Sequence, residues 1–452
     1  MNTRKIINEN FIKPFCAKDR KNIGIELEFP LLNLKKAPVE HSVALGLLEY
    51  MIKNHSFRVA ETDSRGKLAF IINKDGDVLS FDNSYNNFEF SMEKCENLLD
   101  CAKRFYKLYD IVQNFLLPRS HTLCGTGTNP FKEHIKSDFV SFPVYEMIHE
   151  FLGNFCGGAY HTYTDFPAYL SSVQTHLDVK EDELAKSLTL FANLDFVRAL
   201  LFSNSPAFLG ADGFSDCVCF RDYLWEMSGF GSLGKNTGKI CSDFSSISDI
   251  EDLILERKMF NRIRNGKYET ITPVTISEYF NNDDSDENDI GCYLSFCNVE
   301  VTRRGTLEVR SDCAQPVSEA FCASAFNLGI LYAKEKATQL LDEFLNNNIP
   351  KEILESPEKN KILRDNVIYE YKLPASESEV QKLLMALVAL AEESLIKRGL
   401  GEEKLLNPLF ARAEHITCPA LIWKQLLKDG ISIETIIKKF SSADEMVSHL
   451  AF

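Results

Sequence analysis

The run Ile23-Gly-Ile-Glu-Leu-Glu-Phe29 indicates the fold class of this chain. Successive side chains of a β-strand point to opposite faces of a sheet. Ile25, Leu27 and Phe29 therefore share one face, while Glu26 and Glu28 share the other. The same alternation recurs in Asn87-Phe-Glu-Phe-Ser91, Ser172-Val-Gln-Thr-His-Leu-Asp-Val179 and Thr306-Leu-Glu-Val-Arg-Ser-Asp312. Each run predicts a strand with one apolar and one polar face.

The polar faces of these four strands carry an unusual set of side chains. Most are carboxylates or groups that bind metals and phosphates: Glu26, Glu28, Glu89, Gln174, His176, Asp178, Glu308, Arg310 and Asp312. Any strand with one solvated face alternates in this way without a function, but such faces are ordinarily rich in Lys, Ser and Thr. In one sheet, so many carboxylates would repel one another unless cations lay between them. Oxygen ligands suit Mg²⁺ or Mn²⁺, which usually bind together with substrate phosphates.

Alternating strands favour an antiparallel sheet over a doubly wound parallel one, whose strands read as continuous apolar runs. The predicted fold class is α+β, with a curved, mostly antiparallel sheet backed by helices. Further strands are expected at 57–60, 68–73 and 77–81. Apolar periodicity predicts helices at about 40–54, 92–117, 181–202, 316–346, 376–398 and 417–449, and 350–365 reads as a polar break. No strong linker appears, so residues 1–452 are predicted to form one domain whose part from about 316 is mainly helical.

Composition excludes several classes of partner. The net charge of −15 argues against nucleic acids and anionic membranes, both of which need a basic surface. The first ten residues contain no apolar signal segment, and no run is long enough to cross a membrane. The thirteen cysteines are scattered and read as reduced, mostly buried thiols. A cytoplasmic protein is expected.

Three other features of the sequence are not expected to take part in catalysis or ligand binding. Gly229-Phe-Gly-Ser-Leu-Gly-Lys-Asn236 nearly matches a phosphate-binding loop, but it lacks the final hydroxyl residue, the preceding strand and the following helix. His161 is expected to be structural or exposed. The acidic segment 281–289 is expected to be solvated, with a lid over a site as the alternative.

The quoted motifs resemble those of glutamate–cysteine ligases, most closely the plant-like branch found also in bacteria. Gly24-Ile-Glu-Leu-Glu28, Phe88-Glu-Phe-Ser91 and Leu307-Glu-Val-Arg310 resemble three of its strand motifs. Ser172-Val-Gln-Thr-His-Leu-Asp178, followed by Leu201-Phe-Ser-Asn-Ser-Pro206, resembles a fourth and the helix after it. Arg221-Asp-Tyr-Leu-Trp225 and Cys322-Ala-Ser-Ala-Phe326 extend the match. The motifs occur in order from about residue 20 to 430.

The resemblance implies a glutamine-synthetase-like funnel and an ATP-dependent ligase. Its expected reaction joins the glutamate γ-carboxylate to the cysteine amine through an acyl phosphate, giving γ-glutamylcysteine, the first step of glutathione synthesis. The implied roles fall on seven residues: one metal on Glu26, Gln174 and Glu308, a second on Glu28 and Glu89, the transferring phosphoryl group on Arg310, and the glutamate α-carboxylate on Arg221. His176 shares the strand face of Gln174, so its position by itself suggests a role near the metals or a substrate. ATP and Mg²⁺, or Mn²⁺, are the expected cofactors.

The chain departs from the family at positions that bear on the substrate. His176 replaces an Asn of the plant-like motif, and Asp222 and Tyr223 replace Ser and His beside Arg221. Residues 230–300 match poorly, and loops commonly carry the residues that recognise substrates. Two alternatives therefore stay open: a carboxylate–amine ligase with another donor or acceptor, and a nucleotide-binding module without catalysis.

Overall fold

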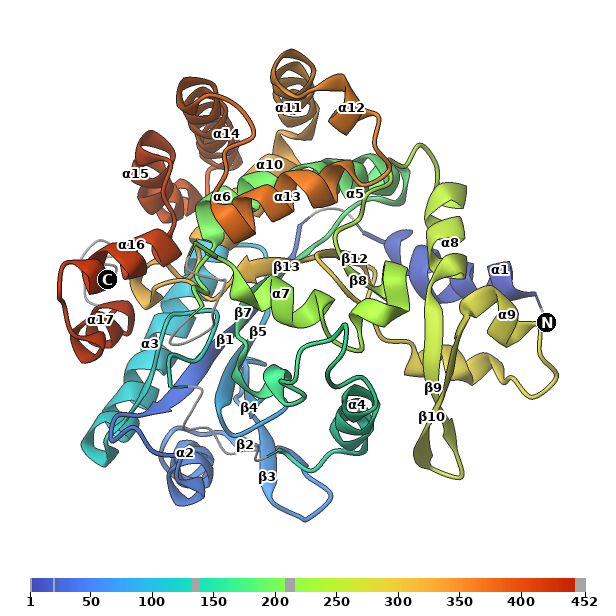
Figure 1. Cartoon of the computed structure of the whole chain (residues 1–452). Helices are drawn as coiled ribbons and strands as arrows, with labels where there is room; N and C mark the ends of the chain where they lie inside the picture. Colours follow the sequence, from blue (N-terminus) through green and yellow to red (C-terminus); the bar gives the residue numbers. More distant parts are fainter. Residues whose placement is uncertain (1, 19–20, 132–138, 208–215, 444–452) are drawn as a thin grey trace.

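A large antiparallel sheet forms the centre of the structure, a computed structural model that describes residues 2–18, 21–131, 139–207 and 216–443 (Figure 1). The strand order is β12-β13-β7-β1-β5-β4-β3-β2, and β6 pairs with the end of β1. The strands are β1 (Ile23–Asn33), β2 (Arg58–Thr62), β3 (Leu68–Ile72), β4 (Val78–Phe81), β5 (Asn87–Cys95), β6 (His121–Leu123), β7 (Ser172–Leu177), β12 (Val299–Val301) and β13 (Leu307–Cys313). The four runs singled out in the sequence are the four adjacent central strands β13, β7, β1 and β5.

The register of these strands gathers their polar residues. Glu28 lies opposite Glu89 of β5, and Glu26 lies opposite Gln174 of β7. On the next pair of strands Glu308 lies opposite His176. The alternate residues of β1 are fully buried in the main hydrophobic core. The predicted division into an apolar and a polar face is thus confirmed, and so is the α+β class.

Helices cover the apolar face of the sheet. Helix α3 (Leu98–Leu116) packs on β5, α10 (Cys322–Tyr332) on β7, and α6 (Asp195–Phe202) on β13. The rings of Phe29 and Phe105 stack with centroids 5.8 Å apart, and Phe90 meets Phe105 edge-on at 5.0 Å. Figure 1 shows the C-terminal helices gathered beyond this layer: α11 (Lys334–Asn348), α12 (Lys351–Leu354), α13 (Lys359–Glu370), α14 (Glu377–Arg398), α15 (Asn407–His415), α16 (Pro419–Lys428) and α17 (Ile433–Phe440).

The remaining elements surround the polar face and the edges of the sheet. The helices are α1 (Thr3–Ile7), α2 (His41–Asn54), α4 (Pro143–Gly153), α5 (Leu184–Asn193), α7 (Phe220–Glu226), α8 (Ile247–Glu256) and α9 (Ile276–Phe280). A hairpin of β9 (Lys258–Arg264) and β10 (Lys267–Thr275) and a short pair of β8 (Thr237–Gly238) and β11 (Phe296–Cys297) complete the fold. In Figure 1, α4 and α7 lie beside the sheet on its open side. No helix in the described ranges is long and apolar enough to span a bilayer.

Several predicted helix limits were wrong. Residues 92–95 belong to β5, and α3 starts only at Leu98 because the Asn97 side chain caps it by accepting hydrogen bonds from two backbone amides. The segment 181–202 is divided at Leu194 and 316–346 at Ala333. The stretch 350–365 contains α12 and the start of α13, although its sequence is polar. The helix predicted over 417–449 is two helices, α16 and α17, within residues 417–443, and positions 444–449 lie outside the described residues.

The alternation predicted that Asp312 lies on the same face as Glu308 and Arg310, and this prediction was wrong. The register of β13 with β7 shifts between Val309 and Asp312, which marks a β-bulge. A bulge inserts one extra residue and reverses the faces beyond it. Asp312 therefore points to the helices, where its carboxylate lies 3.4 Å from Arg198 Nε and accepts a hydrogen bond from Asn327.

The acidic segment 281–289 is only partly solvated. Asp289 is buried and forms an ion pair at 2.6 Å with Arg264, and it accepts a hydrogen bond from the Tyr279 hydroxyl. The segment thereby anchors the β9–β10 hairpin to α9. The expectation of solvation alone was wrong for this residue.

Candidate active site

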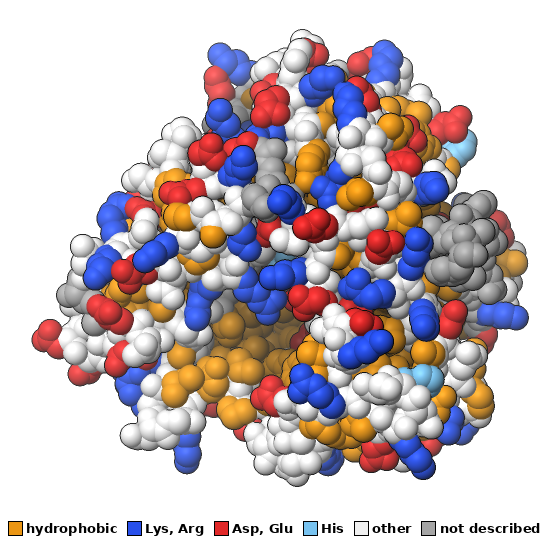
Figure 2. Space-filling view, turned by 180° about the vertical axis from the view of Figure 1, so that it is seen from behind, with side chains coloured by type: hydrophobic (Ala, Val, Ile, Leu, Met, Phe, Trp, Pro, Cys, Tyr) orange, Lys and Arg blue, Asp and Glu red, His pale blue; other side chains and the backbone are white. Residues whose placement is uncertain are grey.

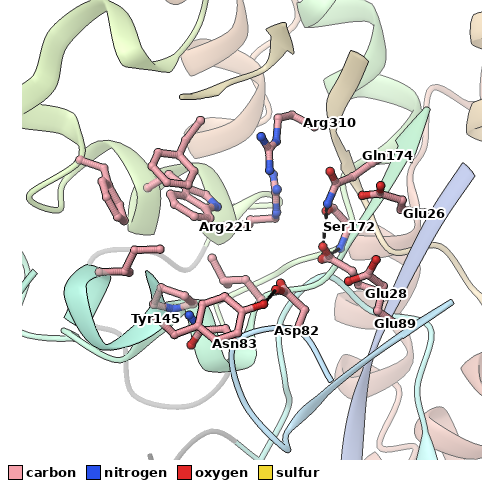
Figure 3. A pocket seen from close by; sticks show the side chains of 16 residues that line it. Glu26, Glu28, Asp82, Asn83, Glu89, Tyr145, Ser172, Gln174, Arg221 and Arg310 are labelled. Atoms are coloured by element: carbon pink, nitrogen blue, oxygen red, sulfur yellow. Dashed lines mark hydrogen bonds between the residues drawn. The ribbon is translucent and has the colours of Figure 1, made fainter. Parts of the chain in front are cut away.

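A cavity of about 230 Å³ lies on the polar face of the sheet. Four carboxylates line it from β1, from β5 and from the turn after β4: Glu26, Glu28, Asp82 and Glu89. Figure 3 shows two guanidinium groups, Arg221 and Arg310, on the side away from Asp82 and Glu89. Figure 2 shows that this molecule is hollowed on one face, with hydrophobic side chains on the walls and charged ones at the edge.

Three of the carboxylates form one cluster. Oxygen atoms of Glu28, Asp82 and Glu89 all lie within 4.8 Å of one another. Glu28 accepts hydrogen bonds from Ser172 N at 2.7 Å, Ser172 Oγ at 3.0 Å and Gln174 Nε2 at 2.7 Å. Asp82 accepts one from the Tyr145 hydroxyl at 3.0 Å. Glu89 accepts one from the Ser91 hydroxyl. These bonds fix the direction of all three carboxylates, so the cluster is built before any ligand arrives.

The cluster raises the pKa values of its own members. Burial and the charge of Asp82 raise the pKa of Glu28 to about 7, despite the opposing charge of Arg221 and the hydrogen bonds from Ser172. Burial and three neighbouring carboxylates raise the pKa of Glu89 well above its ordinary value. Burial also raises the pKa of Asp82. Crowded carboxylates that resist ionisation are typical of sites that accept a cation or carry out proton and phosphoryl chemistry.

Glu26 lies at the edge of the cavity and behaves differently. Its Oε1 lies 3.4 Å from His176 Nε2 and accepts a hydrogen bond from Arg304 Nη1 at 3.1 Å. Burial opposes ionisation of this carboxyl group, but His176 and Arg304 outweigh it and lower the pKa to about 2. Glu308 and Glu26 likewise raise the pKa of His176 against the effect of burial. His176 therefore serves Glu26 and Glu308 as a counter-charge.

The two arginines differ in how fully they are bonded. Arg310 Nη1 donates to the Ser295 carbonyl oxygen at 3.2 Å, and its Nε lies 3.6 Å from Glu308 Oε1. Arg221 is buried, and its Nε has no hydrogen-bond partner within the described parts of the chain. A buried guanidinium with an unmet donor beside a cavity is suited to an anionic ligand.

The structure brings most of the sequence-predicted residues together. Glu26, Glu28, Glu89, Gln174, Arg221 and Arg310 all line the cavity. Glu308 and His176 do not, but they lie directly beyond it on β13 and β7 and contact Arg310 and Glu26. His161 lies elsewhere, with its Nε2 bonded to the Leu224 backbone, as a structural histidine.

Sequence reasoning missed four polar contributors: Asp82, Asn83, Tyr145 and Ser172. Ser172 could have been found, since it stands two residues before Gln174 and so shares its face. Asp82 follows the last residue of β4 and Tyr145 lies on α4, so no strand alternation points to either.

The carboxylate cluster has the donor atoms that a divalent cation requires. Glu28, Asp82 and Glu89 offer only carboxylate oxygens, the ligands that Mg²⁺ and Mn²⁺ prefer. Burial and neighbouring carboxylates raise the pKa values of Glu28 and Glu89, and a cation bound among them would favour their ionised forms. The residues therefore fit such an ion.

No protein-family model and no curated protein matches this chain in sequence. Solved structures match it in fold. A bifunctional glutathione synthetase from Pasteurella multocida aligns over 99% of this chain and 53% of its own, with 13% identity and a TM-score of 0.50. The chain shares its fold. A glutamate–cysteine ligase from Francisella tularensis, solved with AMP, aligns over 96% of this chain and 92% of its own, with 12% identity and a TM-score of 0.48.

The present chain thus spans about half the length of the Pasteurella protein. A ubiquitin-like-protein ligase, PafA, solved with its partner Pup, matches at 12% identity and a TM-score of 0.41, over 91% of this chain and 68% of its own. At 13% identity the similarity to the first establishes the fold, and the case for an activity rests on the cavity.

Proposed function

We propose that this protein is an ATP-dependent carboxylate–amine ligase. One observation carries the proposal: a single cavity on the polar face of an antiparallel sheet is lined by a cluster of three carboxylates and, separately, by two arginines. Phosphoryl transfer needs positioned substrates and neutralised charge more than covalent help from the protein. The cavity offers both.

The proposed reaction has two steps. A substrate carboxylate oxygen attacks the γ-phosphorus of ATP, and the bond to ADP breaks, leaving an acyl phosphate. The amine nitrogen then attacks the acyl carbon, the bond to phosphate breaks, and the amine loses a proton to solvent. Arg310 faces the cavity with a planar fork that suits the transferring phosphoryl group. Arg221, with its unmet donor, binds a substrate carboxylate.

A divalent cation bound to Glu28, Asp82 and Glu89 would neutralise the phosphate charge. Asp82 is thus a third proposed ligand of this ion, beside the Glu28 and Glu89 that the resemblance implied. Gln174 and Ser172 hold Glu28 in place through their hydrogen bonds. Glu308 supports Arg310, and His176 keeps Glu26 ionised. Glu26, Gln174 and Glu308 remain the proposed ligands of a second ion.

Glutamate as donor and cysteine as acceptor are the first pair to test, because the sequence motifs resemble those of glutamate–cysteine ligases. Small-molecule substrates are the only partners proposed. A ligase of the same chemistry with another amine is the second candidate. The largely apolar wall of the cavity opposite the carboxylates favours an acceptor chosen by its side chain.

The decisive experiment measures phosphate release from ATP and Mg²⁺ while each amino acid is omitted or exchanged, and records the product mass. Release that needs both glutamate and cysteine, with γ-glutamylcysteine as product, supports the first pair. Turnover with another pair keeps the ligase and changes the substrate. Tight ATP binding without turnover for any pair would contradict the proposal and favour a binding module.

A further inference from the structure

One wall of the cavity has no use in the phosphoryl-transfer chemistry. Six apolar side chains, called here the apolar wall, form it: Ile148, Pro167, Leu170, Trp225, Phe230 and Phe296. They come from α4, from the 3-10 turn before β7 and the residue after it, from α7, from the segment before β8, and from β11. ATP phosphates and metal ions gain nothing from such a surface, because charge buried against apolar groups loses its hydration.

The rings of the apolar wall hold one another in place. Trp225 stacks on Phe296 with centroids 4.7 Å apart and an interplanar angle of 21°. Phe230 lies 4.2 Å from Phe296, and Phe166 meets Trp225 edge-on at 5.0 Å. Ile148, Leu170 and Phe230 of the wall belong to one hydrophobic cluster with Phe151 and Phe260, which lie behind the rings. The wall is therefore rigid and already formed, as expected of a binding surface rather than a collapsing loop.

Helix α7 places a cation beside this wall. Arg221 and Trp225 are four residues apart on α7, so both side chains project from one face of the helix, about 6 Å apart along its axis. Both line the cavity. A carboxylate on Arg221 therefore has an apolar surface as its immediate neighbour. An α-amino acid has that arrangement, with its carboxylate and side chain on one carbon atom.

Resting on the proposed ligase activity, we propose that the apolar wall is the side-chain subsite of the amino acceptor. The acceptor is an α-amino acid with an apolar side chain, and its carboxylate binds Arg221. Cysteine is the smallest suitable member, since its thiol behaves as a small hydrophobe, and methionine and phenylalanine are larger ones. Glutamate, the proposed donor, carries charge at both ends. It is expected to bind on the other side of the cavity, near Arg310 and the cluster of Glu28, Asp82 and Glu89. Arg221 then binds the carboxylate of the acceptor, and not the glutamate α-carboxylate that the resemblance implied.

The test compares acceptors at fixed ATP, Mg²⁺ and donor. We expect kcat/KM for cysteine, 2-aminobutyrate and methionine to exceed that for serine by at least about tenfold, because a hydroxyl loses its hydration against the wall. Trp225→Ala should lower kcat/KM for methionine by at least about tenfold through KM, and Trp225→Phe should restore most of it. Ile148→Ser, on a different helix, should act in the same direction. Met227→Ala, at the exposed end of α7, is the matched control and should change nothing.

Other outcomes would overturn the subsite. A Trp225→Ala effect confined to the KM of ATP would assign the wall to adenine, and one confined to the KM of glutamate would assign it to the donor. Equal turnover of serine and cysteine would remove side-chain selection altogether. If no acceptor is turned over, the proposed ligase activity is refuted. Calorimetric titration with methionine then tests the subsite by itself. Methionine binding weakened at least about tenfold by Trp225→Ala still supports it, and no methionine binding refutes it.

Discussion

Removing one carboxylate from the cluster should stabilise the metal-free protein. Oxygen atoms of Glu28, Asp82 and Glu89 lie within 4.8 Å of one another, and two unit charges at that distance repel by about 3 kcal/mol at an effective dielectric constant of about 20. Asp82→Asn keeps the shape and a group that can bond to Tyr145. It also loses the attraction of Arg310, which opposes the rise of the Asp82 pKa. We therefore expect a net gain of about 1–3 kcal/mol in unfolding free energy at pH 8.

The pH dependence provides a second, independent reading of the same repulsion. The pKa of Glu28 is about 7 in the folded chain and 4.5 ordinarily. Between these values the folded state holds more protons than the unfolded state, so stability falls as pH rises from about 4.5 to about 7. The shift corresponds to a loss of about 3 kcal/mol. Asp82→Asn should reduce this loss, because it removes the charge that raises the Glu28 pKa.

Urea unfolding in EDTA at pH 5 and pH 8, repeated with excess Mg²⁺, measures these effects. Mg²⁺ should stabilise the wild type, since a ligand that binds only the folded state shifts the equilibrium, and should stabilise Asp82→Asn much less. Asp283→Asn removes the same charge from an exposed position and should change stability by less than about 0.5 kcal/mol. Destabilisation of metal-free Asp82→Asn, equal at both pH values, would refute the idea of a self-repelling metal site.

Three further outcomes test the site and its support. Arg310→Lys should lower kcat at least about tenfold with little change in stability, since a point charge cannot replace a planar fork; steady-state rates equal to the wild type would remove Arg310 from the reaction. Glu308→Ala should abolish Mg²⁺-dependent phosphate release from a protein with a normal circular dichroism spectrum, and near-normal turnover would leave Glu308 without a role. Arg364→Met should destabilise the fold by about 3 kcal/mol, because the buried Asp195 and Asp222 each lose one of two cationic partners and keep only Arg198 and Lys239. A cost under about 1 kcal/mol, measured in urea, would show that this network is dispensable.

The Asp222 network also shows which part of the fold lies beyond sequence reasoning. Arg364 of α13 donates to Asp222 at 2.7 Å, next to Arg221. Residues 350–365 read as a polar break because buried ion pairs look like solvated charges in a sequence. Only their partners on α6 and α7 reveal that this helix holds the base of α7.

Alternation along single strands was enough to predict the polar face and five of the residues that line the cavity: Glu26, Glu28, Glu89, Gln174 and Arg310. The physical reason is local: a strand has a period of two, so a residue's face follows from its neighbours. The same rule failed at Asp312, where a bulge reverses the faces and only the pairing with β7 reveals it.

The sequence by itself determined the α+β class, the polar face of β1, β5, β7 and β13, and which carboxylates and which arginine of these strands lie on it, because these depend on residue type and local period. Only the tertiary structure decided that Asp82 completes the cluster, that His176 and Glu308 stand outside the cavity, and that an apolar wall faces Arg221. Those features join turns and helices far apart in the chain, and their distances follow from packing rather than from any repeat in the sequence.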